Sequence, residues 1–156
     1  MPKAAKRPGL TQALGVLMLH VEHRKMFSIN GLIDDFVIFG KPSDYIEFAR
    51  AVDASIRSGE VSILHTATPL RIEINSESEL KELMTSLQNQ SNQYLSMDDW
   101  ERRDILRLWG SPTLLEQLRL FLVDLAGRGE GYSYLSEYSE THSYDHLCPV
   151  WRLHVL

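Results

Sequence analysis

The chain has very little cysteine: Cys148 is the only one among 156 residues. A single cysteine cannot form a disulfide within the chain, and its scarcity favours a reducing compartment. Long apolar runs are also missing, since none approaches the roughly 18 residues that a membrane-spanning helix needs. We therefore predict a cytoplasmic protein with no membrane span.

The common catalytic and nucleotide-binding motifs are absent too. The sequence contains no G-x-S-x-G, no Walker glycine loop and no G-x-G-x-x-G. The stretch from His20 to His23 contains Glu22 but does not have the residue spacing of the H-E-x-x-H zinc motif. We therefore predict that the chain is not an enzyme and carries no cofactor.

Positive charge is scarce in the part of the chain that we expect to fold. The formal net charge is −5, and three of the 16 basic residues, Lys3, Lys6 and Arg7, fall in residues 1–9, which we predict to be a disordered tail. An acidic body disfavours binding to a phosphate backbone, so we expect no nucleic-acid partner. It favours a protein partner with a basic surface, although acidity can also serve solubility alone.

What the sequence does contain is an internal repeat with a spacing of 70 residues. Two stretches align without a gap, and both have glycine, proline and apolar residues at the same places. The aligned pairs are Gly40/Gly110, Pro42/Pro112, Gly59/Gly129, Glu60/Glu130, Tyr45/Leu115, Phe48/Leu118 and Val52/Leu122.

Each copy predicts a strand, a helix and two further strands. In the first copy we expect a buried strand at 35–39, a helix capped by Ser43 or Asp44 and ending at Ser58, and strands at 61–66 and 70–74. In the second copy we expect a strand at 105–109, a helix at 114–125, and strands at 132–138 and 150–156. The last strand comes about ten residues later than the repeat requires, so the loop before it is longer.

The second helix is apolar almost all round. We predict that Leu118 and Leu122 are buried in the core. We also expect that this helix is either more buried than the first or covered by a partner subunit, which makes a homodimer possible.

Together these elements predict an α+β fold in which two βαββ repeats form an antiparallel or mixed sheet packed by helices. We expect one domain over 10–156, with halves at about 35–75 and 105–156 and a helical linker at 76–104. The stretch 35–109 also fits a ferredoxin-like β-α-β-β-α-β order, which stays open. Residues 10–34 could add a hairpin with strands at 16–21 and 25–29.

The strongest metal-ligand candidates are His142, His146 and Cys148, because two imidazoles four residues apart and a thiolate can ligate zinc. They lie in the lengthened loop, and histidines four apart share a face only in a helix. Cys148 precedes Pro149 and fits better as a packing residue at the start of a strand. We therefore predict no metal site. His65 and His154 lie in predicted strands, where we expect hydrogen-bonded structural histidines.

The same loop gathers acidic and aromatic residues, a combination that suits contact with a basic protein surface. Its polar and aromatic residues could equally belong to an ordinary exposed hairpin. As partner-binding residues we predict Glu137, Tyr138, Glu140, Tyr144 and Asp145. The next place to expect a partner is the exposed side of the 43–58 helix, with Asp44, Glu47 and Asp53.

The second copy runs from a strand ending in Gly110-Ser111-Pro112, through a leucine-rich helix, to the closing strand at 151–156. This pattern resembles a small immunity-protein family of bacterial polymorphic-toxin systems, over roughly the last fifty residues and more loosely over 36–74. Members often carry histidine in the strand after the helix, where this chain has Tyr132 and Tyr134. The resemblance implies a protein that binds and blocks a toxin encoded beside it.

Residues and resemblance together predict a non-enzymatic protein-binding module, an immunity protein that neutralises a cognate toxin. The alternative is a small-molecule-binding or regulatory domain of the ferredoxin-like type.

Overall fold

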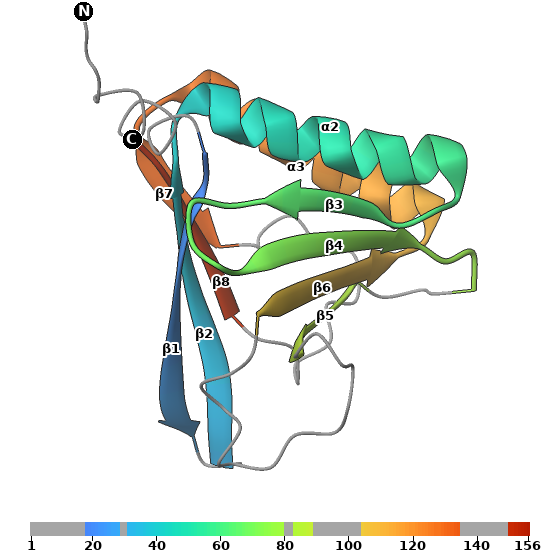
Figure 1. Ribbon diagram of the computed structural model, residues 1–156. Coiled ribbons are helices and arrows are strands. Elements are labelled where there is room, and N and C mark those ends of the chain that lie inside the picture. The colour runs from blue at the N-terminus through green and yellow to red at the C-terminus, as the bar shows by residue number, and fades with distance from the viewer. Residues whose placement is uncertain (1–17, 29–30, 80–82, 89–103, 135–149) are drawn as a thin grey trace, which may run out of the picture.

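The computed structural model describes residues 18–28, 31–79, 83–88, 104–134 and 150–156. Two helices and eight strands lie within these ranges (Figure 1). The first half contains β1 (His20–Ser28), β2 (Gly31–Gly40), α2 (Pro42–Ser58), β3 (Ser62–His65) and β4 (Arg71–Ser76). The second half contains β5 (Met84–Gln88), β6 (Ile105–Gly110), α3 (Pro112–Arg128), β7 (Gly131–Tyr134) and β8 (Val150–Val155).

The strands form two mixed sheets of four strands each, which confirms the α+β class. Sheet A has the order β1-β2-β8-β7, and sheet B has the order β3-β4-β6-β5. Each sheet therefore takes two neighbouring strands from each half of the chain. The strands that join the halves run parallel, β2 beside β8 and β4 beside β6, and the outer pairs are antiparallel.

The two halves have the same topology, and each contains the predicted βαββ unit preceded by one further strand, β1 or β5. Gly40 lies opposite Val155, and Gly110 lies opposite Ser76. The next residue donates a backbone hydrogen bond at both places, from Leu156 to the Gly40 carbonyl at 2.9 Å and from Glu77 to the Gly110 carbonyl at 2.8 Å. Ser76 and Val155 are therefore equivalent, and they are 79 residues apart. Because the repeat spacing is 70 elsewhere, the second half contains nine additional residues before its last strand.

The helical linker predicted at 76–104 is wrong where the structure describes it, because β5 is a strand paired antiparallel with β6. Leu83 and Thr85 are buried while Met84 and Ser86 are less so, which is the two-residue period of a strand. Leucines spaced by three and four fit a short helix equally well, and only the pairing with β6 decides between them.

The ferredoxin-like interpretation is also wrong. It requires β2 and β4 in one sheet, whereas β2 lies in sheet A and β4 in sheet B. The hairpin considered for residues 10–34 is wrong where the structure describes them, because residues 20–28 form the single strand β1, which pairs with β2. Residues 1–9 lie outside the described part of the chain.

The helices start and end at the glycine and proline positions that the two halves of the repeat share. Helix α2 begins at Pro42, and its Asp44 side chain accepts the Lys41 backbone N–H at 2.8 Å, so the cap lies at Lys41 rather than at Ser43 or Asp44. Gly59 ends α2 at φ +72°, a conformation that favours glycine. In α3, Ser111 is the N-cap and accepts the Leu114 N–H at 3.3 Å.

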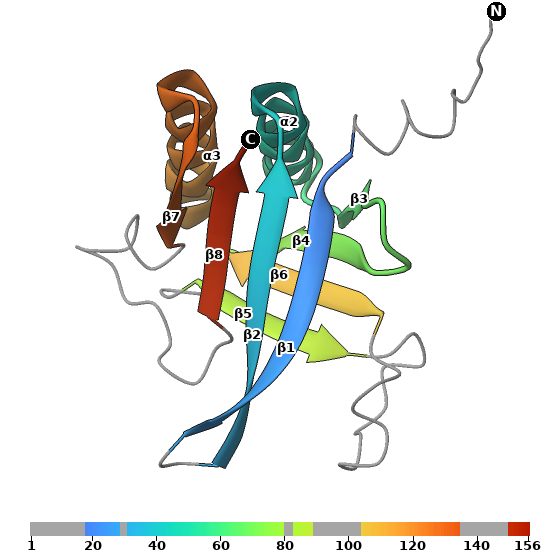
Figure 2. The same cartoon turned by 90° about the vertical axis from the view of Figure 1, so that its left-hand side faces the viewer.

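One core lies between the helices and the inner faces of both sheets. Figure 2 shows the two helices side by side at one end, with the strands of sheet A crossing in front of those of sheet B. The largest fully buried side chains come from both halves: Trp151, Tyr45, Phe36, Phe48, Ile38, Ile72, Ile74, Leu83, Ile105, Leu106, Leu108 and Leu115. Leu118 and Leu122 are also fully buried, as predicted. Neither α2 nor α3 is long and apolar enough to cross a membrane.

Tyr45 ties α2 to both halves of sheet A. Its buried hydroxyl donates to the His154 carbonyl of β8 at 2.6 Å and lies 3.1 Å from the Ile38 carbonyl of β2. Burial raises the pKa of this hydroxyl, and the nearby Asp44 carboxylate raises it further. Tyr45 therefore stays neutral and remains a hydrogen-bond donor.

Replacement of Leu122 by Ala should lower the free energy of unfolding by about 2–5 kcal/mol, because it leaves a cavity in the core. Leu120, on the same helix, is 52% exposed, so Leu120→Ala is a matched control that should change stability by less than about 0.5 kcal/mol. Urea denaturation of both variants measures the difference. Equal midpoints would contradict the packing of α3 described above.

Gly40 should tolerate no side chain, because a Cβ there would lie 2.5 Å from the Leu19 Cδ2 and 3.1 Å from the Asp44 Cβ. We expect Gly40→Ala to destabilise the fold by about 1–3 kcal/mol through overpacking. At Gly127, in α3, a Cβ meets nothing within 4 Å, so Gly127→Ala should stabilise by about 0.5–1 kcal/mol. Thermal melting of the two variants should shift in opposite directions.

Candidate functional site

The predicted partner-binding and metal residues lie in 135–149, outside the described residues. This holds for Glu137, Tyr138, Glu140, Tyr144 and Asp145, and for His142, His146 and Cys148. The structure does place the strands on either side of them: β7 ends at Tyr134 and β8 begins at Val150, next to each other in sheet A. In the described part of the chain, no group of three or more His, Cys, Asp or Glu could hold a metal ion.

The outer face of sheet A is turned toward the viewer in Figure 2. One row of rings crosses all four strands on this face. Strand residues alternate between the faces of a sheet, so β2 and β8 bury Ile38 and Leu153 in the core and turn their neighbours outward. The strand register places the outward residues directly opposite one another. We call this set the aromatic row: His20, Phe39, His154 and Tyr132.

Neighbouring rings in the row contact one another. Ring centroids lie 6.2 Å apart for His20 and Phe39, 5.1 Å for Phe39 and His154, and 5.2 Å for His154 and Tyr132. The planes of His154 and Tyr132 differ by only 22°, so these two rings stack. A stacked ring offers its edge to an approaching molecule, and ring edges carry partial positive charge.

The row is accessible at both ends. Tyr132 is 57% exposed and His20 is exposed, while Phe39 and His154 are half-buried. Tyrosine buries a large area on binding at a low entropy cost, which is why it is enriched at protein interfaces. The row is therefore suited to contact with a macromolecule.

Arg152 lies two residues before His154 in β8, on the same face of sheet A. Its positive charge acts on the neighbouring rings of the row. Its guanidinium carbon lies 5.8 Å from the centroid of the Tyr132 ring, in a cation–π arrangement. Burial lowers the pKa of His154, and the positive charge of Arg152 lowers it further. The buried Nε2 of His154 has no hydrogen-bond partner, so the expectation of a hydrogen-bonded structural histidine is wrong for this residue.

His154 should make the fold less stable in mild acid. Because its pKa is lowered in the folded state, the unfolded chain takes up the proton first as the pH falls below about 6.5. The free energy of unfolding therefore decreases as the pH falls, until the pH reaches the folded-state pKa of His154. From pH 7.5 to pH 5, the urea midpoint should therefore fall less for His154→Gln than for the wild type. An equal fall in both proteins would contradict this assignment.

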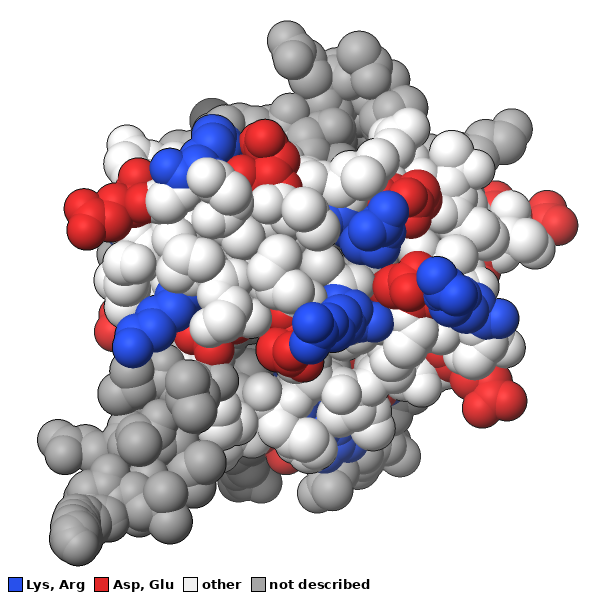
Figure 3. Space-filling view, turned by 90° about the horizontal axis from the view of Figure 1, so that it is seen from above, with Lys and Arg blue, Asp and Glu red and all other residues white. Residues whose placement is uncertain are grey.

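The helices present a different surface, in which positive and negative charges alternate (Figure 3). Each arginine of α2 and α3 is paired with a carboxylate on its own helix: Arg50 with Glu47, Arg57 with Asp53, Arg119 with Glu116, and Arg128 with Asp124. Of the acidic residues expected to attract a partner here, Asp44 is buried in its cap, and Glu47 and Asp53 are paired.

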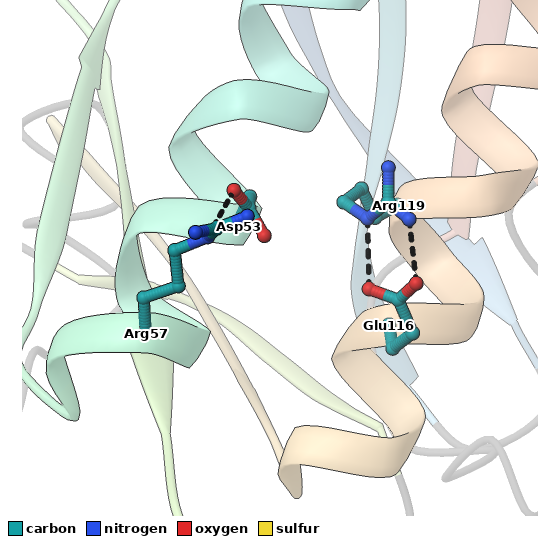
Figure 4. Close-up of polar contacts among 4 residues, drawn as sticks. All are labelled: Asp53, Arg57, Glu116 and Arg119. Carbon is teal, nitrogen blue, oxygen red and sulfur yellow. Dashed lines mark hydrogen bonds and ion pairs between the residues drawn. The ribbon is translucent and has the colours of Figure 1, made fainter.

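Two of these pairs face each other across the helices, and Figure 4 shows them together. The hydrogen bond from Arg119 lowers the pKa of Glu116 and raises that of Arg119, and Arg57 and Asp53 of α2 add to these shifts. The helix surface therefore has no single sign of charge with which to steer a partner. The apolar Leu120 and Val123 of α3 are exposed at 52% and 38%. Of the two alternatives expected for this helix, coverage by a partner subunit stays a prediction.

Comparison with protein-family models, with curated proteins and with solved structures finds no match to this chain. The resemblance to the immunity-protein family therefore stays a prediction.

The sequence did not point to the aromatic row. Its four rings come from four strands, and they become neighbours only through the parallel pairing of β2 with β8. The available signal was local: β7 and β8 each place a ring at an outward position of a strand next to the predicted loop. In the sequence Tyr132 differs only from the histidine of the immunity-protein pattern, and nothing there connects it with His154, Phe39 or His20.

Proposed function

We propose that this protein is a non-enzymatic protein-binding module, an immunity protein that neutralises a cognate bacterial toxin. The contact surface would be the outer face of sheet A together with residues 135–149. The observation that carries the proposal is the aromatic row. Two of its rings, Tyr132 and His154, lie on β7 and β8, the strands that flank the predicted partner-binding residues in the sequence.

The internal repeat supports a functional role for the row. Sheet B has the same topology as sheet A, and its equivalent positions are Met84 for His20, Trp109 for Phe39 and Asn75 for His154. The scaffold therefore folds in sheet B without a continuous row of rings. Rings that the fold does not need are candidates for binding.

The charge of the chain supports a basic partner. The formal net charge is −5, and the segment of the sequence between β7 and β8 contains Glu137, Glu140 and Asp145. Carboxylates at the edge of an interface speed the association of a basic protein by steering its approach. The ferredoxin-like alternative loses its basis, because the strand order is not ferredoxin-like.

The test is protection of cells that express the toxin encoded beside this gene. The wild-type protein should bind that toxin and restore growth. Tyr132→Ala should weaken binding about tenfold or more, as truncation of an interface tyrosine commonly does. Reversal of Glu137 and Glu140 to Lys should slow association, most strongly at low salt.

Leu120→Ala provides the matched control, since it truncates an exposed side chain on α3 rather than on sheet A. It should protect cells as the wild type does, and all variants should keep the wild-type melting temperature. Full protection and unaltered affinity in both the Tyr132 and the Glu137/Glu140 variants would remove this face from the interface. A wild-type protein that binds no neighbouring toxin would overturn the proposed function itself.

A further inference from the structure

Arg152 differs from every other arginine whose side chain the structure describes. The other six each contact a carboxylate: Arg50, Arg57, Arg71, Arg107, Arg119 and Arg128. Within the described residues Arg152 has no carboxylate partner, and its buried Nε has no hydrogen-bond partner. A half-buried guanidinium on an acidic chain is thus left without a counter-charge.

The equivalent position in sheet B shows what a satisfied site looks like. Arg152 in β8 corresponds to Glu73 in β4, and the Glu73 carboxylate contacts Arg71 at 3.0 Å and Arg107 at 3.2 Å. In sheet A the place of Arg107 is taken by Val37, which is apolar and buried. The scaffold can therefore surround this position with opposite charge, and in sheet A it does not.

Glu22, an acid on the same face whose side chain the structure describes, does not fill the gap. Glu22 lies in the same row of the sheet as Arg152, but on β1, with Val37 of β2 between them. Two strand spacings amount to about 10 Å, too far for an ion pair. The Glu22 carboxylate instead lies 3.5 Å from the Nε2 of His20.

The buried Nε–H of Arg152 lacks an acceptor, which costs stability, and that cost is offset when an acceptor arrives. A planar guanidinium matches a carboxylate through two parallel hydrogen bonds. The face of the Tyr132 ring already lies against the guanidinium carbon of Arg152, at 5.8 Å from the ring centroid. Nucleic acid is a poor occupant, because a single arginine on a chain of net charge −5 cannot neutralise a phosphate backbone.

We propose that Arg152 anchors a carboxylate side chain, an Asp or Glu, of the protein partner, next to the stacked rings of Tyr132 and His154. This inference rests on the proposed function and names the chemistry that the partner must bring to sheet A. A partner with a basic surface would thus also carry one acidic residue at the centre of its contact.

The test uses the full chain and a tetraglutamate peptide as the probe, at about 0.15 M ionic strength so that long-range repulsion is screened. In ¹H–¹⁵N NMR spectra the Arg152 Nε–H resonance should shift and saturate as peptide is added, and the Tyr132 ring resonances should follow. Arg152→Gln should weaken binding about tenfold or more, the loss expected when one charge-assisted hydrogen-bonded contact is removed.

Arg50→Gln is the matched control, because Arg50 is exposed on α2 and already paired with Glu47. It should bind the peptide as the wild type does. Arg152→Lys keeps the charge but loses the planar fork, so its affinity should fall between those of the wild type and Arg152→Gln. Its melting temperature also checks that position 152 tolerates replacement.

Absence of saturable binding, or equal binding by the wild type and Arg152→Gln, would overturn the inference. Inorganic phosphate that shifts the Arg152 resonance at lower concentration than the peptide would also overturn it, in favour of a phosphate ligand. A toxin that binds the wild type and Arg152→Gln equally well would defeat this inference alone. Peptide binding at Arg152 without any toxin binding would defeat the proposed function alone.

Discussion

The parallel pairing of strands from opposite halves is the constraint on which the whole structure depends. Neither half can complete a sheet by itself, because β2 needs β8 and β4 needs β6. The repeat therefore does not form two small domains in a row. It forms one core to which each half contributes a helix and two pairs of strands, and the buried residues form a single cluster.

That pairing also explains the two strand-end glycines. At Gly40 and Gly110 a strand of one half ends beside the last strand of the other, and the start of the following helix crosses close by. At both positions a leucine just before the neighbouring strand, Leu19 or Leu83, occupies the space where a Cβ would lie. The repeated glycine thus marks a close approach of side chain to backbone that both halves share.

The sequence predicted the parts of this fold that depend on neighbours along the chain. Glycine and proline punctuation marked both helices, and the apolar stripe identified Leu118 and Leu122 as core residues, because helix faces are set by local periodicity. The prediction from sequence was wrong at β5, where a few leucines fit the period of a helix as well as that of a strand. It also could not anticipate the exchange of strands between halves, since parallel pairing across more than one hundred residues leaves no local pattern.

The candidate site shows the same limit. The acidic residues of 135–149 were found by composition, whereas the aromatic row and the unpaired Arg152 depend on which strands lie side by side. No residue of the row is unusual in its own stretch of sequence. A residue type that is present at only one of two equivalent positions in sheets A and B is not required by the fold.

The position of β8 inside sheet A has a consequence for how the protein is made. A ribosome releases β1, β2 and α2 long before β8, and until then β2 exposes the edge that β8 will cover. The contact between Tyr45 and His154 spans 109 residues and must wait equally long. Sequence-distant contacts of this kind slow folding. The first half thus emerges with an unsatisfied strand edge, and it is during synthesis, rather than in the finished molecule, that aggregation or exchange with another chain is the greater hazard.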